Sequence, residues 1–148
     1  VRPHNFYGPR AGYDHVIYEF IDRISKKVDP FPVFGSDNTR TFCYIDDAVK
    51  AMQMCMDSDK TNDYPIETIH IGNTDEISMI GLLEKLLGLM KWEPKNMDIQ
   101  LAPEGSVKRR LADITKIKNL VGWQPETSLE NGLSKTIDWY LKHPKNNG

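Results

Sequence analysis

The sequence predicts an α/β fold, because segments with the two-residue period of strands alternate with segments that have the period of helices. The chain has 148 residues, which suits one domain or a large piece of one and is enough to bury a core. Hydrophobic residues make up 39% of it and charged residues 27%, values typical of a globular protein. The alternation is irregular, and we find neither an internal repeat nor a linker that would divide the chain.

Gly, Pro and hydrophobic periodicity mark the first elements. Residues 3–14 contain two prolines and two glycines, and we expect a loop there. Apolar residues at helical spacing predict a helix over 16–24 that ends before Pro30. The segments 31–34 and 41–45 are rich in apolar, aromatic and β-branched residues and predict two strands.

A second helix is expected directly after the second strand. Asp46 is suited to be its N-cap, since a short carboxylate can accept a hydrogen bond from the first helical turn. The expected core face of this helix consists of Val49, Met52 and Met56. The polar residues 57–65 then predict a loop, and the alternation over 66–71 predicts a strand.

The second half of the sequence predicts three further helices and a strand. Ser78 can cap the first of these helices. Its expected core face consists of Ile80, Leu83, Leu87 and Met90. Residues 96–101 alternate like a strand, and Asp113 can cap a short helix. Thr127 and Glu130 have the spacing of a capping box at the start of the last helix. The residues of that helix expected to face inward are Leu133, Ile137, Tyr140 and Leu141.

Composition and charge exclude several classes of protein. The formal net charge is −2 and no basic stripe is present, which argues against nucleic acid as a partner. Cys43 and Cys55 lack metal-binding spacing, and reduced thiols in a cytoplasmic protein are the plain interpretation. No apolar run reaches the roughly 18 residues of a membrane helix, and no signal peptide is visible. The chain begins with Val1 rather than Met, and we expect a fragment or a processed product.

Three segments carry residue types that can bind a phosphorylated ligand. In the first, residues 2–10, Asn5 lies in a loop rich in Gly and Pro. We expect this loop to follow a strand, and open α/β sheets bind ligands beyond the carboxyl ends of their strands. The amide of Asn5 can donate to a phosphate oxygen, or it can simply cap the turn, and the residues alone leave both roles open.

The second segment, residues 31–47, contains an extended piece with an aromatic residue. Phe34 can contact a flat base while neighbouring backbone groups meet the edge of that base. Arg40 is suited to a bidentate phosphate contact. The alternative is that Phe34 belongs to the core and that Arg40 is a solvated charge.

The third segment, residues 105–113, contains the cationic run Lys108, Arg109 and Arg110. Three charges are too few to bind a nucleic-acid duplex but are sufficient for one phosphate or a pyrophosphate. If the segment is extended, only one or two of the three side chains can point toward a ligand. A solvated loop is the alternative.

The order and separation of the three segments resemble the C-terminal half of the extended short-chain dehydrogenase/reductase family. This family includes UDP-glucose 4-epimerases, UDP-glucuronate decarboxylases and dTDP-glucose dehydratases. The resemblance rests on RxxNxYGP at 2–9, HVIxxFI at 15–21, VFGSDNTRTFCYIDD at 33–47, ADITK at 112–116 and LVGWxPxxSLxxGL at 120–133. It covers nearly the whole chain. It implies a substrate-binding portion over 1–148, with a small mixed sheet and flanking helices, that lacks the N-terminal NAD-binding Rossmann half.

The resemblance also implies roles for individual residues. Asn5 and Arg40 would bind the nucleotide diphosphate, together with Arg109 or Arg110, and Lys108 is a further candidate. The residues implied at the base, which we expect to be uracil, are Pro32, Val33 and Phe34. Those implied to line the nucleotide or sugar pocket are Val16 and Ile17. Those implied on the nicotinamide side of NAD are Tyr7 and Pro9.

Two features of the family are missing from the sequence. It contains no GxxGxxG loop for the cofactor, and none of its six tyrosines is followed four residues later by the Lys of a Tyr-x-x-x-Lys pair. We therefore name no catalytic residue and no metal ligand. We expect the chain alone not to transfer a hydride. The resemblance implies that the parent protein is a homodimeric enzyme that uses NAD and a nucleotide sugar.

Two functions of different classes follow. The chain is either the substrate-binding part of an NAD-dependent nucleotide-sugar epimerase or dehydratase, or a non-catalytic module that binds a nucleotide sugar or a protein. A structural α/β domain without a ligand is the third interpretation.

Overall fold

The computed structural model describes residues 1–59 and 68–145, which form an α/β structure as predicted. The helices of this part are α1 (Val16–Ser25), α2 (Ile45–Met56), α3 (Met79–Met90), α4 (Thr115–Val121) and α5 (Leu129–Lys142). The strands are β1 (Arg2–Pro3), β2 (Phe6–Tyr7), β3 (Phe31–Phe34), β4 (Thr39–Thr41), β5 (Cys43–Tyr44), β6 (His70–Ile71), β7 (Glu76–Ser78), β8 (Met97–Gln100) and β9 (Arg109–Arg110).

The strands pair into four small sheets. Strands β1 and β6, β2 and β5, and β3 and β8 form parallel pairs. The fourth sheet has the order β7-β4-β9, in which β4 is antiparallel to β7 and parallel to β9. Parallel pairing requires long crossovers, so segments far apart in the sequence are brought together at each sheet.

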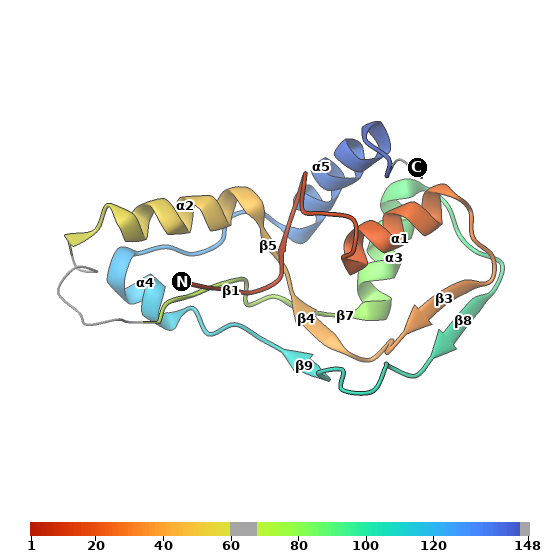
Figure 1. Ribbon diagram of the computed structural model, residues 1–148, viewed down its shortest axis with the longest axis horizontal. Coiled ribbons are helices and arrows are strands. Elements are labelled where there is room, and N and C mark those ends of the chain that lie inside the picture. Colours follow the sequence, from red (N-terminus) through yellow and green to blue (C-terminus); the bar gives the residue numbers. More distant parts are fainter. Residues whose placement is uncertain (60–67, 146–148) are drawn as a thin grey trace.

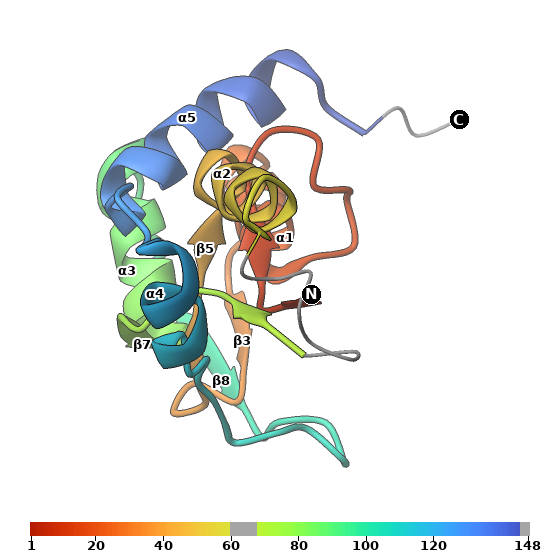
Figure 2. The ribbon, with the colours of Figure 1, turned by 90° about the vertical axis from the view of Figure 1, so that its left-hand side faces the viewer.

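Two hydrophobic cores lie at opposite ends of the molecule (Figure 1). The first, the α1–α3–α5 core, also contains β3, and its fully buried side chains include Ile21, Phe31, Leu82, Leu86 and Leu133. The second, the α2–α4 core, is built around Ala48, Ala51, Ile71, Ile117 and Trp123. Strands β4, β5 and β9 run between the two cores, and the view in Figure 2 shows α5 passing above α2.

Asp47 connects α2 to the segment that leads into α5. Its buried carboxylate accepts hydrogen bonds from the backbone N–H groups of Glu126 (3.2 Å) and Thr127 (2.8 Å). Its backbone carbonyl accepts a third bond from the indole of Trp123 (3.1 Å). This carboxylate satisfies two partly buried backbone donors of the loop before α5.

The second helix differs from its prediction in both start and face. It begins at Ile45 with Tyr44 at the N-cap position and without a side-chain cap, so the prediction of Asp46 as the cap was wrong. Its buried residues are Asp47, Ala48, Ala51 and Cys55. Val49 is 42% exposed and Met56 is 80% exposed, and only Met52 of the predicted face packs partly against the core. The small side chains of Ala48 and Ala51 face the core because α2 packs closely against its neighbours there.

The other elements agree more closely with expectation. Ser78 caps α3 through a hydrogen bond from Gly81 N (3.1 Å), and β3 has the predicted bounds. Asp113 accepts a bond from Thr115 N (2.9 Å) at the start of α4, although Ile114 occupies the N-cap position. The strand predicted over 41–45 is divided between β4 and β5.

The last helix begins one residue later than predicted. Ser128, not Thr127, is the N-cap of α5, and its hydroxyl accepts a hydrogen bond from Asn131 N (3.3 Å). Leu141, which we expected to face inward, is 52% exposed. The predicted loop over 57–65 and strand over 66–71 fall partly on residues 60–67, which lie outside the described residues.

Candidate functional site

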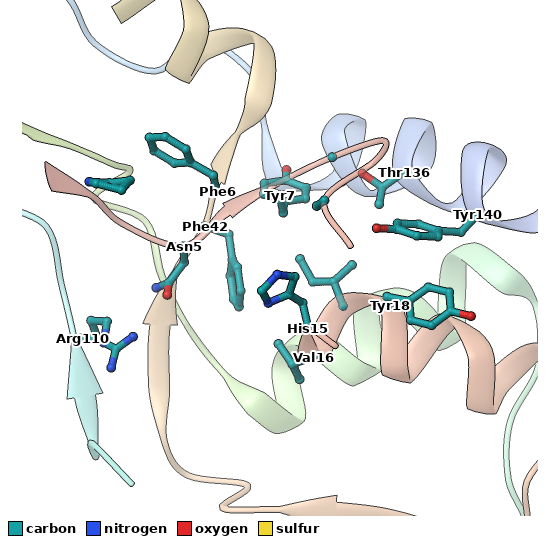
Figure 3. Close-up of a pocket in the computed structure, with 14 residues that line it drawn as sticks. Asn5, Phe6, Tyr7, His15, Val16, Tyr18, Phe42, Arg110, Thr136 and Tyr140 are labelled. Atoms are coloured by element: carbon teal, nitrogen blue, oxygen red, sulfur yellow. The ribbon is translucent and has the colours of Figure 1, made fainter. Parts of the chain in front are cut away.

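A cleft of about 450 Å³ opens between the N-terminal segment, α1 and α5. Its size is within the range of about 300–1,000 Å³ typical of small-molecule sites. Figure 3 shows Asn5 and Arg110 toward one end of the cleft and the hydroxyl-bearing side chains of Tyr18 and Tyr140 toward the other. The cleft therefore has a cationic, amide-bearing end and an aromatic end.

Asn5 lies between β1 and β2 in a left-handed backbone conformation, with φ of 44°. Asn tolerates this conformation better than most residues do. The side-chain amide donates to the carbonyl of Thr41 (2.8 Å), and the backbone carbonyl accepts from Cys43 N (3.2 Å). These bonds hold Asn5 at the cleft, and the amide oxygen and second amide hydrogen remain as groups that a ligand could use.

Arg40 and Arg110 are direct partners in the parallel β4–β9 pair. Side chains that are paired in this way lie on the same face of a sheet. Arg110 lines the cleft, while Arg40 beside it donates to the carbonyls of Thr39 (2.7 Å) and Lys108 (3.4 Å). Burial and the nearby Arg110 charge both lower the pKa of Arg40. Two adjacent guanidinium groups thus repel each other and create a local positive field that favours an anion.

Arg109 points to the opposite face of the same sheet. It forms a two-pronged ion pair with Glu76 on β7, with Nε–Oε1 and Nη2–Oε2 distances of 2.8 Å. Thr39 on β4 also donates to this carboxylate. The hydrogen bonds from Arg109 and Thr39 lower the pKa of Glu76 to about 2. Of the two arginines that the sequence left open, the structure brings Arg110 to the cleft and engages Arg109 elsewhere.

The positive charge of this region is not neutralised within the described part of the chain. None of the ion pairs among residues 1–59 and 68–145 involves Arg40 or Arg110.

Residues 1–59 and 68–145 contain no group of three His, Cys, Asp or Glu side chains that could hold a metal ion. In the same ranges, no helix is long and apolar enough to cross a bilayer.

Val16, Ile17 and Tyr7 line the cleft. The contact of Val16 and Ile17 with a nucleotide or sugar stays a prediction. Val16 and Ile17 belong to the first turn of α1, with Ile17 buried. Tyr7 is buried, and its hydroxyl donates to the carbonyl of Leu129 (3.3 Å). Burial, with smaller contributions from Cys43, Tyr44 and Asp47, raises the pKa of Tyr7. This hydroxyl is therefore a protonated, structural group at neutral pH.

Pro9 lines a second hollow of about 420 Å³, which adjoins the cleft and shares Phe6, Tyr7, Ala11 and His15 with it. Phe6, Arg10 and Ile45 complete most of its walls. Its apolar walls and single arginine suit a flat ring near a phosphate. The contacts predicted for Tyr7 and Pro9 on the nicotinamide side stay predictions.

The three residues predicted at the base lie on β3, outside the lining of both hollows. Val33 is fully buried in the α1–α3–α5 core, so only its backbone could meet a ligand. Phe34 is 44% exposed, and the Pro32 carbonyl accepts from Arg23 (3.4 Å). Their contact with a base stays a prediction.

Several cleft residues were not selected from the sequence. His15, Phe42, Thr136 and Tyr140 line the cleft, although Tyr140 had been predicted only as a core residue. The hydroxyl of Tyr140 donates to Gly12 O (2.6 Å), which joins α5 to the loop before α1. No pattern within a single segment reveals this pairing, because the two residues are distant in the sequence.

The fold and cleft describe an α/β protein with a small-molecule-sized site whose cationic end is built from β9 and the segment after β1. The family model for GDP-mannose 4,6 dehydratase matches residues 1–136. The chain is 36% identical to a UDP-N-acetyl-alpha-D-glucosaminuronate decarboxylase of Bacillus cytotoxicus, over 95% of this chain and 45% of that protein. It is 35% identical to a UDP-glucuronate 4-epimerase of Thermodesulfobacterium geofontis, over 94% of this chain and 42% of that protein.

Solved structures of nucleotide-sugar epimerases also superpose on the chain. A UDP-glucuronic acid 4-epimerase from Bacillus cereus, in complex with UDP-glucuronic acid and NAD, superposes with a TM-score of 0.86 at 26% identity, covering 95% of this chain and 44% of that one. A UDP-glucose 4-epimerase from Thermotoga maritima, with UDP-glucose, superposes with a TM-score of 0.82 at 28% identity, covering 95% and 45%.

The chain belongs to the family of extended short-chain dehydrogenase/reductase epimerases and dehydratases, whose cofactor is NAD. It spans less than half the length of the relatives it matches.

Proposed function

We propose that this chain is the nucleotide-sugar-binding part of an NAD-dependent epimerase, dehydratase or decarboxylase, and that a UDP-sugar is its ligand. The observation that carries the proposal is the cationic end of the cleft, where Arg110 lines the wall, Arg40 is its neighbour in the sheet and Asn5 completes the group. A diphosphate has the charge and the acceptor oxygens that two guanidinium groups and an amide can bind.

The rest of the ligand would extend from this cationic end. We propose that the sugar lies along Val16 and Ile17 and that the base meets the β3 segment at Pro32, Val33 and Phe34. The UDP-sugars named for several relatives and bound in solved neighbours favour uracil as the base.

The chemistry would need more than this chain supplies. NAD, when bound, accepts and returns a hydride, and in our proposal only Tyr7 and Pro9 of this chain approach its nicotinamide side. The sequence has no GxxGxxG loop and no Tyr-x-x-x-Lys pair, so we propose that 1–148 binds substrate but is not catalytically competent alone. The parent would be a cytoplasmic, homodimeric enzyme.

The experiment is calorimetric titration of the 148-residue chain with UDP-glucose and with a GDP-sugar. Removing a charge-assisted hydrogen bond to phosphate costs about 1.5–3 kcal/mol. We therefore expect Arg110→Ala to weaken UDP-glucose binding by about tenfold or more. Arg40→Ala should act in the same direction.

Arg109→Gln is the matched control, because this arginine is next in sequence but pairs with Glu76 on the opposite face. We expect it to change the affinity by less than about threefold. Equal losses at Arg109 and Arg110 would contradict the proposed arrangement. A chain that binds no nucleotide sugar would instead support a protein-binding or purely structural role.

A further inference from the structure

A hydrogen-bonded pair of histidines joins β1 to β6 beside the proposed diphosphate site. His4 Nε2 lies 2.7 Å from His70 Nδ1, and the two rings stack with centroids 4.8 Å apart. His4 stands between Pro3 and Asn5, which both line the cleft. Its backbone N–H donates to Ile71 O (2.9 Å), so the pair and the strand contact fix the backbone that leads into Asn5.

Gly72 brings this pair close to the strand that carries Arg110. A Cβ atom on Gly72 would lie 2.9 Å from the Cβ of His4 and 2.6 Å from the Cβ of Ala112. Real side chains do not approach so closely, so the absence of a side chain at Gly72 lets the two segments meet. Ala112 follows Arg110 by two residues, which places His4 behind the cationic end of the cleft.

The charges that face the pair come from three segments. Arg2 on β1 and Arg110 on β9 act on His4, while Asp113, ahead of α4, acts on His70. Burial, then His70, Arg110 and Arg2, lower the pKa of His4. His4 is therefore neutral near pH 7 in the free protein, and one ring nitrogen of the pair donates to the other.

We propose that the His4–His70 pair is a proton-accepting part of the diphosphate site and takes up a fraction of a proton from solvent when the diphosphate binds. This inference rests on the proposed function. One added proton preserves the pair, because an imidazolium donates to the free ring nitrogen of its neighbour and forms a charge-assisted bond. Bound phosphates offset the field of Arg110, which removes one of the causes that disfavour the charged form of His4.

Linkage then makes nucleotide-sugar affinity depend on pH. If binding raises the pKa of His4 by about half a unit to one unit, affinity increases by at most about threefold to tenfold as the pH falls from 8 through the pKa of His4, and net uptake peaks at about 0.3–0.5 proton. The coupling is reciprocal: ligand binding strengthens proton binding, and proton binding strengthens ligand binding by the same factor.

The test is calorimetric titration with UDP-glucose between about pH 5.5 and 8, in buffers of different ionisation enthalpy, which gives the number of protons taken up. The phosphates of UDP-glucose are diesters and lack the monoester pKa near about 6, so the ligand does not titrate in this window. His4→Gln/His70→Asn places amide groups near the positions of the two bonded ring nitrogens and removes both imidazoles. His143→Gln, at the end of α5 and outside the cleft lining, is the control.

We expect proton uptake and a pH-dependent affinity in the wild type and in His143→Gln, and neither in the double variant. Proton uptake that persists in the double variant would overturn the inference. Loss of proton uptake in His15→Gln would also overturn it, because the His15 imidazole lines the cleft and would then be the proton acceptor. If the double variant does not fold, two single variants test the inference instead. It then requires that proton uptake persists in His15→Gln and is lost in His70→Asn. Binding without proton uptake refutes the histidine role but leaves the proposed function intact, whereas no binding at any pH refutes both.

Discussion

At the residue scale, Gly132 on α5 determines where the Tyr7 ring can lie. A Cβ atom at this position would overlap the Tyr7 hydroxyl and would lie 2.8 Å from Cζ of the same ring and 3.0 Å from Cδ2 of Tyr44. The Tyr7 hydroxyl donates to Leu129 O nearby, so the ring is held on one side by the helix that it touches. Tyr7 also lines the cleft, which connects this packing to the site.

Gly132→Ala is therefore expected to destabilise the protein, against the usual helix preference for Ala. Overpacking of this kind costs about 1–3 kcal/mol, which exceeds the roughly 1 kcal/mol that Ala gains over Gly in a helix. Chemical denaturation measures the change. Gly88→Ala on α3 is the control, because nothing lies within 4 Å of its added Cβ, and we expect it to stabilise by about 0.5–1 kcal/mol. Stabilisation by both substitutions would show that Tyr7 can move freely.

Arg109 and Arg110 show how adjacent residues acquire different roles. Each strand residue points to the face opposite its neighbour, so pairing of Arg110 with Arg40 necessarily directs Arg109 toward Glu76. The carboxylate of Glu76 is available there because β7 lies on the other side of β4. The register of one short sheet thus decides which arginine reaches the cleft.

At the scale of elements, the start of α5 distinguishes two neighbouring hydroxyl residues. Ser128 accepts from Asn131 N, whereas the backbone N–H of Thr127 donates to Asp47. We expect Ser128→Ala to lower the free energy of unfolding by about 1 kcal/mol, the usual cost of losing an N-cap. Thr127→Ala should change it by less than about 0.5 kcal/mol, because its backbone bond to Asp47 is retained. Equal costs in thermal or urea unfolding would contradict this assignment of the cap.

At the scale of the whole molecule, α2 presents an apolar stripe to solvent. Val49 and Met56 are 42% and 80% exposed, and Met52 lies between them on the same side of the helix. Ile99 and Leu101, in and after β8 at the other end of the molecule (Figure 1), are also exposed but are not part of this stripe. Monomeric proteins rarely expose large contiguous apolar patches, so surfaces of this kind favour association.

We expect the 148-residue chain to self-associate in sedimentation experiments as its concentration rises. Val49→Lys/Met56→Lys should shift it toward the monomer, because two charges on the stripe oppose burial of that face. Gln53→Lys, an exposed position of the same helix, adds a charge beside the stripe and should have a smaller effect. A wild-type chain that stays monomeric at all concentrations would rule out this role of α2.

The sequence was informative wherever a signal is local. The helix from Val16, the strand 31–34 and the Ser78 cap follow from periodicity and capping chemistry. The loop predicted over 3–14 is interrupted by β2, a two-residue strand that its distant partner β5 stabilises. Helical spacing also identified an apolar stripe on α2, but spacing alone does not say which side faces the core. The side with Ala48 and Ala51 faces the core because α2 packs closely against its neighbours, where small residues fit better than larger apolar ones.

By itself, the sequence determined the α/β class, the family resemblance and the residue types that can hold a diphosphate. The tertiary structure alone decided that Arg110 rather than Arg109 reaches the cleft, that Asn5 is fixed by Thr41, and that His4 meets His70. The Asn5–Thr41 and His4–His70 contacts join residues 36 and 66 positions apart. Parallel strand register sets them, and register depends on how distant segments pair rather than on any pattern within one segment.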